Sequence, residues 1–343
     1  MLQKQADIIT TWKPVVAIVG PTAIGKSRIG IEVAKILNTE ILTADSRQVY
    51  RGMNIGTDKP SLAEQQGIPH RLIDLVDPDQ SFNVGDFRQH ATQDIARLHR
   101  QGLLPLVIGG TGLYIRALLR GLCPGPPADW LIRNELAQEA KTQGPAFLHK
   151  KLQEVDPDLA QRLHPNDQPK IQRALEVYRI SGTPLSVMQQ QHQFDDTPYP
   201  SLLIGLTMNR QALYQRIETR VEWEIHKGLV EETQSLMDQG FVRELGSMKG
   251  LGYQQFSGYL AGDYSYEEAV RLLKRDTRHF AKRQMTWFQK EPGIQWITLE
   301  ESDIPDRVAT KIMDHINQFL HTFANSPFPT KATSNSEPSH FSG

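Results

Sequence analysis

The sequence predicts an α/β protein: a P-loop-type parallel sheet core flanked by helices, with an inserted all-helical domain. Three observations lead to this prediction. Short apolar runs rich in β-branched residues alternate with stretches of helical periodicity. A glycine-rich phosphate-loop motif follows the first such run. Between residues 123 and 193 the pattern is helical throughout. Together these features indicate a sheet covered by helices, interrupted by one helical segment.

The elements follow in order along the chain. Residues 15–19 (VVAIV) form a continuous apolar run, which predicts a strand buried on both faces. Apolar residues recur with a helical period over residues 26–37, which predicts the helix that follows. Further strands are expected at residues 40–44, 104–108 and 202–208. Long helices are expected to begin near Asn209 and at Ser265, the second running to about Lys290 with a break allowed within it.

Changes in pattern divide the chain into parts. The CPGPP segment at residues 123–127 is typical of a linker. Asp156-Pro157 and Asp167, shortly before Pro169, are typical of helix starts, and Gly182 of a helix end. We therefore expect a first core part at residues 14–122, a helical insert at 123–200 and a second core part at 201–324. Residues 325–343 are rich in Ser, Pro and Thr, and we expect this tail to be disordered.

Composition excludes several classes of protein. The 343 residues include 38 Lys plus Arg and 39 Asp plus Glu, a net charge of −1, so any basic surface must be local. A single cysteine excludes an internal disulfide framework. No run approaches the length of a membrane span, and the first 14 residues lack the apolar centre of a signal peptide. We expect a cytoplasmic protein with no membrane association.

The phosphate-loop motif is the strongest local signal. Residues 20–27 read GPTAIGKS, a full match to GxxxxGK[ST] between a predicted strand and a predicted helix. The backbone N–H groups and the helix start favour a diphosphate or triphosphate. Lys26 adds a positive charge, and the Ser27 hydroxyl can ligate Mg²⁺. The expected phosphate-binding residues are Gly20, Pro21, Thr22, Ala23, Ile24, Gly25, Lys26 and Ser27.

A carboxylate follows the second predicted strand. Asp45 begins the segment DSRQVYRGMNIGTDKP, and in a parallel sheet its strand end lies near the phosphate loop. Three roles remain open for it on pattern alone: metal ligand, general base, or cap of the next turn. For Thr57, Asp58 and Lys59, further along the segment, we expect ordinary turn chemistry.

Six motifs occur in one order along the chain: GPTAIGKS, DSRQVYRGMNIGTDKP, PHRLID, VIGGTGLY, RALEVYRISGTPLS and DTRHFAKRQMTWF. Together they resemble the tRNA dimethylallyltransferase (tRNA isopentenyltransferase) family in its bacterial form. The resemblance implies transfer of a dimethylallyl group from dimethylallyl diphosphate to N6 of adenosine 37 of tRNAs that read codons beginning with U. It also implies that the phosphate loop holds this donor rather than ATP.

The resemblance assigns roles to individual residues. Asp45, Thr111 and Arg220 match catalytic positions: the general base, a tRNA contact and a diphosphate-binding arginine. On pattern alone, a turn or cap hydroxyl is the less favoured alternative for Thr111. Thr22 matches a donor-binding position, and Mg²⁺ on Ser27 is the implied cofactor.

The same resemblance implies that the helical insert clamps the tRNA anticodon stem-loop. One difference from the family is Lys170, where an arginine is usual; lysine keeps a phosphate contact but loses the two-pronged arginine geometry. The implied tRNA-contacting residues are Asp45, Ser46, Arg47, Gln48, Thr111, Arg133, Pro169, Lys170, Ile171, Gln172 and Arg173.

A basic stretch adds candidates from charge alone. Residues 271–290 carry seven Lys or Arg against one acid, Asp276, in a nearly neutral chain. A solvated charged face is the plainer explanation, but the concentration of charge favours contact with a phosphate backbone. Arg275, Arg278 and Lys282 recur at helical spacing, and we add them to the expected tRNA contacts.

Three other functions compete with tRNA prenylation. Adenylate dimethylallyltransferase would use the same loop and Asp45 on a free nucleotide. A small-molecule or nucleotide kinase would place ATP in the loop, and a non-catalytic protein would only bind tRNA. The helical insert favours tRNA over a free nucleotide, and the intact GKS sequence and Asp45 favour catalysis. We expect a monomer.

Overall fold

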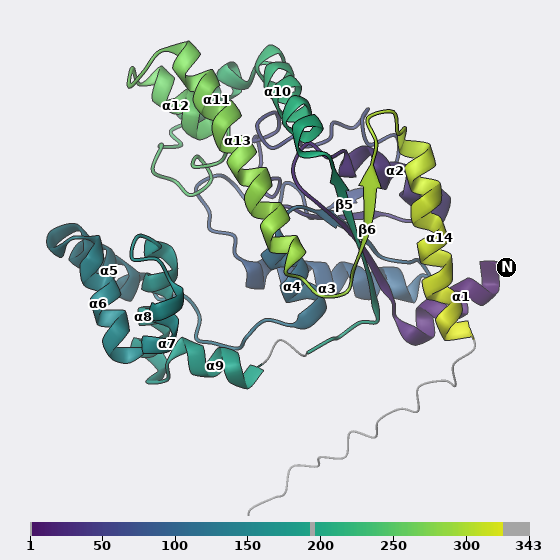
Figure 1. Ribbon diagram of the computed structural model, residues 1–343, viewed down its shortest axis with the longest axis horizontal. Helices are drawn as coiled ribbons and strands as arrows, with labels where there is room; N and C mark the ends of the chain where they lie inside the picture. Colours follow the sequence, from purple (N-terminus) through teal and green to yellow (C-terminus); the bar gives the residue numbers. More distant parts are fainter. Residues whose placement is uncertain (1, 193–195, 325–343) are drawn as a thin grey trace, which may run out of the picture. The chain divides into compact units, whose positions relative to one another are not determined.

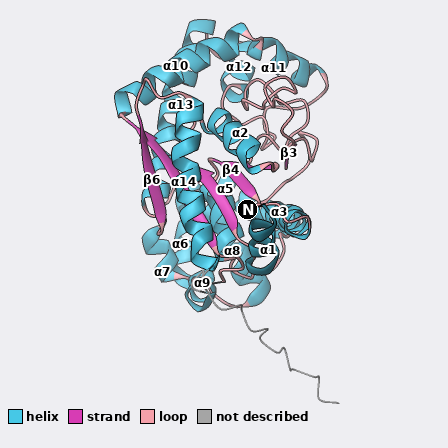
Figure 2. Ribbon diagram, turned by 90° about the vertical axis from the view of Figure 1, so that its right-hand side faces the viewer, coloured by secondary structure: helices cyan, strands magenta, loops and turns pink. Residues whose placement is uncertain are grey.

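The computed structural model describes residues 2–192 and 196–324 (Figure 1). The expected disordered tail at 325–343 lies outside the described residues. The described chain divides into two compact units, residues 1–115 with 199 onward, and Arg116–Pro198. The first unit holds a parallel sheet whose strands, drawn in magenta in Figure 2, follow the order β3-β2-β4-β1-β5-β6. The predicted α/β fold class is confirmed.

The strands are β1 (Val15–Val19), β2 (Ile41–Ala44), β3 (His70–Arg71), β4 (Leu106–Gly109), β5 (Ser201–Met208) and β6 (Ile294–Leu299). The helices of the first unit are α1 (Leu2–Trp12), α2 (Lys26–Leu37), α3 (Val84–Arg100), α10 (Arg210–His226), α11 (Leu229–Asp238), α12 (Tyr253–Leu260), α13 (Tyr266–Gln289) and α14 (Pro305–Ala324). Helix α4 (Gly112–Arg120) begins in the first unit and ends in the second.

The register of the strands brings three loops together at the carboxyl ends of the strands. Val19, the last residue of β1, pairs with Gly109 of β4, and Gly109 also pairs with Ala44, the last residue of β2. All these strands are parallel, so their carboxyl ends lie side by side. The phosphate loop, Asp45 and Thr111 therefore all lie at the carboxyl ends of the strands, on the same side of the sheet.

Two apolar clusters hold the first unit together. Residues of β1, β4 and β5 pack with α2 and α14, and these two helices also contact each other. A separate cluster joins α10, α11, α12 and the first half of α13 to the loop after β2, through side chains that include Met53, Leu229, Tyr253 and Phe256. Figure 1 shows these four helices gathered beside the sheet. The loop after β2 is thus fixed by helices far away in the sequence.

The second unit is a small helical bundle. It contains α5 (Trp130–Gln143), α6 (Pro145–Val155), α7 (Pro157–Arg162), α8 (Gln168–Ser181) and α9 (Leu185–His192). Its core is formed by leucine, isoleucine and alanine side chains, among them Leu136, Leu148, Leu152 and Ile171. Asp156 accepts the N–H of Leu159 and caps α7, and Gly182 ends α8 with φ 69°. These two helix boundaries lie where the sequence predicts them.

Local elements differ from expectation at a few places. Strand β4 begins at Leu106 rather than 104, because Pro105 has no N–H to donate to the sheet. Helix α13 runs unbroken over 24 residues, so the break allowed within it is absent. The elements that the sequence does not predict include helix α1 and both edge strands of the sheet, β3 and β6. No helix of the described chain combines the length and apolar character needed to cross a membrane.

Candidate active site

The phosphate loop leads from β1 into the first turn of α2. Gly25 caps α2 with φ 101°, a conformation that favours glycine and lets the loop close tightly. Lys26 Nζ donates to the carbonyl of Pro21 at 2.7 Å, so the lysine folds back over the loop. Arg216 of α10 donates to the carbonyl of Ile24 at 3.3 Å. The loop is therefore braced by an arginine from a distant helix.

Gln284 of α13 provides a second brace. Its Oε1 accepts the N–H of Thr22 at 2.8 Å, and its Nε2 donates to the carbonyl of Gly110 at 3.0 Å. The side chain is buried, and both polar ends are satisfied. Gln284 thus connects the phosphate loop to the end of β4.

Arg220 of α10 lies against the phosphate loop. Its Nη1 donates to Thr22 Oγ1 at 2.8 Å and lies 3.1 Å from Asp58 Oδ2. Its Nε donates to Glu224 Oε1 at 2.6 Å, one turn further along α10. The two residues matched to donor binding, Thr22 and Arg220, are therefore in direct contact.

Asp45 directly follows β2 and makes local hydrogen bonds. Its Oδ1 accepts the N–H of Arg47 at 2.8 Å and that of Gln48 at 3.3 Å, so the carboxylate caps the next turn. Within the described residues, Oδ2 has no hydrogen bond. The capping role, one of the three left open by the pattern, occupies one oxygen and leaves the other available to accept a proton.

Thr111 lies beside this turn and does not line the cavity that the phosphate loop and Asp45 share. Its Oγ1 accepts the N–H of Ser46 at 3.1 Å, and its own N–H donates to the carbonyl of Ala44 at 3.2 Å. The hydroxyl therefore holds the turn that carries Asp45.

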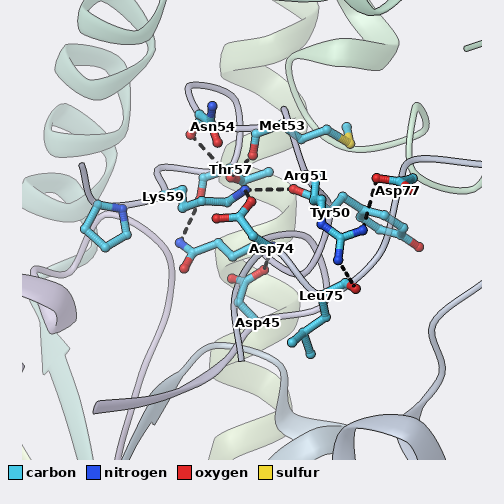
Figure 3. Close-up of polar contacts among 12 residues, drawn as sticks. Asp45, Tyr50, Arg51, Met53, Asn54, Thr57, Lys59, Asp74, Leu75 and Asp77 are labelled. Carbon is cyan, nitrogen blue, oxygen red and sulfur yellow. Dashed lines mark hydrogen bonds and ion pairs between the residues drawn. The ribbon is translucent and has the colours of Figure 1, made fainter. Parts of the chain in front are cut away.

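The loop between β2 and β3 is held by a dense set of polar contacts (Figure 3). Thr57 Oγ1 donates to the carbonyl of Met53 at 2.7 Å. Lys59 Nζ donates to the carbonyl of Tyr50 at 2.7 Å and to Asp74 at 2.6 Å, with its side chain 5% exposed. The buried Gln48 amide donates to the carbonyls of both Thr57 and Asp58 at 3.0 Å. The contacts of Lys59 stay within the loop and fit the expected turn chemistry. Asp58 differs, because its side chain also forms an ion pair with Arg220.

Glu232 of α11 fixes the same loop from outside. Its carboxylate accepts the backbone N–H groups of Asn54 and Ile55 at 3.1 and 2.9 Å, and that of Gly56 at 3.4 Å. The buried Tyr253 hydroxyl donates to it at 2.5 Å. One carboxylate thereby joins α11, α12 and the loop that presents Thr57 and Asp58.

These elements surround one cavity in the first unit. Phosphate-loop residues line one side, Asp45 and Asp58 line another, and Ile41, Ile108 and Phe280 add apolar surface. The lining residues are Thr22, Lys26, Ser27, Ile41, Thr43, Asp45, Gln48, Thr57, Asp58, Pro60, His70, Ile108, Gly109, Gly110, Arg220, Phe280 and Gln284.

Burial and neighbouring charge set the protonation of the two cations. Burial lowers the pKa of Lys26 to about 8; Asp45 opposes this shift and Arg220 adds to it. Burial alone would also lower the pKa of Arg220, but Glu224, Asp58 and Asp45 hold it above its usual value. Arg220 is a permanent positive charge at the loop, whereas the charge of Lys26 changes near neutral pH.

In the second unit, two of the expected tRNA contacts share an ion-pair cluster, whereas Ile171, also expected to contact tRNA, is buried in the helical core. Arg133 and Arg173 both bind the buried Glu176 carboxylate, at 2.8 and 2.6 Å. Each arginine side chain is still about a third exposed, at 33% and 35%. Lys170 is 68% exposed and pairs with Asp167. All three basic side chains therefore retain surface that a phosphate can reach.

The basic residues of α13 differ in their partners. Arg275 pairs with Asp276 at 2.8 Å, and Arg278 pairs with Glu218 of α10 at 2.8 Å. Lys282 is exposed and lines a shallow surface hollow with His279, Arg283, Thr286, Trp287 and Lys290. Two of the three expected contacts are thus already neutralised within the protein, and Lys282 is the most accessible of them.

The site combines a phosphate loop, an arginine and a carboxylate. Comparison with known proteins shows the family to which the chain belongs. The family model described as IPP transferase matches residues 48–291. The chain belongs to the IPP transferase family. The match covers the loop after β2 from Gln48 onward, the helical unit and α13. The recognised family resemblance is therefore confirmed.

Relatives of this family are similar over most of the chain. A tRNA dimethylallyltransferase 2 from Geotalea uraniireducens is 48% identical over 305 residues, covering 89% of this chain and 96% of the relative. A tRNA dimethylallyltransferase from Natranaerobius thermophilus is 47% identical over 317 residues, covering 92% and 95%.

Solved structures agree with these IPP transferase relatives. The full-length tRNA isopentenylpyrophosphate transferase of Bacillus halodurans has a TM-score of 0.69 at 40% identity, covering 91% of this chain and 98% of its own. A eukaryotic dimethylallyltransferase acting on tRNA has a TM-score of 0.77 at 27% identity, covering 93% of this chain and 81% of its own.

Several residues of this site were not anticipated from the sequence. Gln284 and Glu232 reach the site or its supporting loop across long sequence separations, whereas Glu224 binds Arg220 from the next turn of the same helix. Asp58 was assigned to turn chemistry only. The one available signal was charge: Glu224 lies four residues after Arg220, the spacing of a helical ion pair.

Proposed function

We propose that this protein transfers a dimethylallyl group from dimethylallyl diphosphate to N6 of adenosine 37 of tRNAs reading codons that begin with U. One observation carries the proposal: the Asp45 carboxylate and the phosphate loop with Arg220 line the same cavity. A base and an anion site facing one space suit a displacement in which a diphosphate leaves and an amine loses a proton.

The transfer balances as a substitution at the first carbon of the allyl group. The adenine N6 forms the new C–N bond as the carbon–oxygen bond to the diphosphate breaks. N6 then carries one proton too many, and Oδ2 of Asp45 accepts it. Arg220, Lys26 and the loop N–H groups stabilise the charge that develops on the leaving diphosphate. The acceptor base must leave the anticodon-loop stack to reach Asp45.

The residues present fit Mg²⁺ that is shared with the substrate. The Ser27 hydroxyl lines the cavity beside the carboxylates of Asp45 and Asp58, which are hard oxygen donors. Among the described residues, no group of three or more His, Cys, Asp or Glu forms a metal site, so diphosphate oxygens would complete the coordination. When bound, Mg²⁺ neutralises charge on the diphosphate. Ser27 is the protein residue we assign to it.

The tRNA partner is supported by local positive charge in a chain of net charge −1. Lys282 on α13 and the exposed parts of Arg133, Arg173 and Lys170 are suited to bind phosphates. We assign these residues to the anticodon stem-loop and expect the protein to act as a monomer.

The acceptor distinguishes this activity from its rivals. The purified protein is incubated with labelled dimethylallyl diphosphate and Mg²⁺, with either unmodified tRNA or AMP. We expect label on tRNA and a mass gain of about 68 Da on one adenosine, rather than the gain of about 80 Da that phosphorylation would give. Label on AMP alone would identify a nucleotide prenyltransferase. ATP consumption without either product would indicate a kinase.

A further inference from the structure

Arg220 is held from two sides by groups of different kinds. On one side, the buried Glu224 carboxylate binds Nε at 2.6 Å from the same helix. On the other, Nη1 faces the phosphate loop, where it meets Thr22 Oγ1 and Asp58 Oδ2. The nitrogen best placed to bind a phosphate oxygen beside Thr22 is therefore also the nitrogen that binds Asp58.

Asp58 has a fixed backbone and a more accessible side chain. Its N–H donates to the carbonyl of Ile55 at 3.0 Å, and its own carbonyl accepts Gln48 Nε2 at 3.0 Å. The Asp58 side chain is 41% exposed, against 6% for that of Glu224. Asp58 can therefore rotate about its Cα–Cβ bond without moving the loop, whereas Glu224 is packed in place.

The charges that line the cavity oppose one another. Lys26 and Arg220 are balanced by Asp45 and Asp58, with Glu224 directly behind Arg220. A diphosphate at the loop brings several negative charges within a few ångströms of Asp58. A diphosphate oxygen bound to Arg220 Nη1 would lie beside the Asp58 carboxylate, and two like charges at one nitrogen repel each other.

We propose that Asp58 is a competing anion for Arg220: diphosphate displaces its carboxylate from Nη1, and the carboxylate returns as the product diphosphate leaves. The inference rests on the proposed function and deepens it, since it assigns diphosphate release to a named residue. Asp58 forms no bond to the reacting atoms. It weakens the hold of Arg220 on the diphosphate and thereby favours turnover.

The competition predicts a gain in affinity when the charge is removed. Asp58→Asn keeps the shape of the side chain and removes its negative charge, so Arg220 is held by a weaker, neutral acceptor that the ligand displaces more readily. Inorganic diphosphate should then bind roughly tenfold more tightly, the order of effect of one partly screened charge at this range. Its release after one turnover should slow by a similar factor.

The test measures the Kd of inorganic diphosphate by calorimetry, with and without Mg²⁺. It compares the unaltered full-length protein with the variants Asp58→Asn and Asp58→Ala. Asp77→Asn is the matched control, because Asp77 also pairs with an arginine, Arg51, but lies outside the cavity lining. We expect tighter binding in both Asp58 variants and no change in the control. The second readout is the rate at which the protein releases diphosphate after one turnover with tRNA.

Three other outcomes would each overturn the inference. Affinity unchanged within about twofold in both Asp58 variants would overturn the inference, because the carboxylate would then not compete. Weaker binding, confined to reactions with Mg²⁺, would overturn it in favour of a metal-ligating Asp58. If the unaltered protein does not bind diphosphate at all, the proposed function itself fails, and the inference fails with it.

Discussion

Gln284 and Thr22 are joined by a hydrogen bond across 262 residues of sequence. The bond ties the second-to-last turn of the basic helix α13 to the phosphate loop, and the other end of the same amide donates to the carbonyl of Gly110. A helix that we assign to tRNA binding therefore also shapes the phosphate loop.

Replacing Gln284 should damage both stability and donor binding. Gln284→Ala leaves the Thr22 N–H and the Gly110 carbonyl without their buried partner, which costs about 1–3 kcal/mol of unfolding free energy. We also expect weaker diphosphate binding, because the N–H groups of the loop lose their alignment. Chemical denaturation and calorimetry measure the two effects. Gln289→Ala, an exposed position on α13, is the control, and equal behaviour of the two variants would refute the role.

The low pKa of Lys26 predicts a pH-dependent affinity for diphosphate. With a pKa of about 8, the free lysine loses its charge as pH rises from 7 to 9, so binding should weaken over this interval. Lys26→Arg stays protonated throughout and should lack that loss. The ratio of the two affinities cancels the ionisation of diphosphate itself. A ratio that does not change with pH would contradict the assignment.

The same shift affects folding with a defined sign. Because burial lowers the pKa of Lys26 below its unfolded value of 10.5, the unfolded chain binds more protons between about pH 8 and that value. The Lys26 contribution to unfolding free energy should therefore rise with pH across this interval. Denaturation of the unaltered chain and Lys26→Met, compared at pH 7.5 and 9.5, measures it. A difference between the two proteins that stays constant with pH would contradict this expectation.

Glu232 should act through the loop it holds. Glu232→Ala removes the acceptor for three backbone N–H groups and for the Tyr253 hydroxyl, so we expect lower thermal stability and weaker donor binding. Glu231→Ala is the matched control, since it removes a neighbouring carboxylate from the same first turn of α11. If both substitutions had the same effect, helix electrostatics rather than the loop contact would explain it.

Accessibility should rank the basic residues of α13. Lys282→Glu is expected to weaken tRNA binding and to reduce the slope of log affinity against log salt by about 1. Reversal of Arg275 or Arg278 should have smaller effects, because each already pairs with a carboxylate. Lys311→Glu on α14 is the control. Filter binding over a range of salt concentrations measures all four, and an unchanged slope for Lys282→Glu would exclude the contact.

How much of this structure the sequence predicts depends on how far apart the interacting residues are. The phosphate loop, β1 and α2 are predictable because their signals are contiguous: five buried residues, a glycine motif and a helical period. The edge strand β6 carries no such run, since its inner residues are mostly exposed, and it exists because β5 provides a pairing edge. Asp45 could be placed near the loop by strand order alone.

Contacts across the fold escape sequence reasoning. Nothing local to Gln284 or Glu232 indicates which backbone groups they bind, because those groups are more than 170 residues away. Asp58 lies in a segment with turn composition, and its partner Arg220 is on the distant helix α10. The resemblance identified Thr22 and Arg220 one at a time, but only the three-dimensional structure shows them sharing a hydrogen bond with a competing carboxylate nearby.

The central claim is that Asp45 accepts the proton of the adenine amine, and one measurement tests it directly. Single-turnover transfer of labelled dimethylallyl diphosphate to unmodified tRNA is compared for the unaltered protein and Asp45→Asn, whose side-chain oxygen can still accept the Arg47 and Gln48 N–H groups. We expect the variant to bind tRNA and diphosphate normally and its transfer rate to fall by about 10²- to 10⁴-fold. Transfer at the unaltered rate would contradict it.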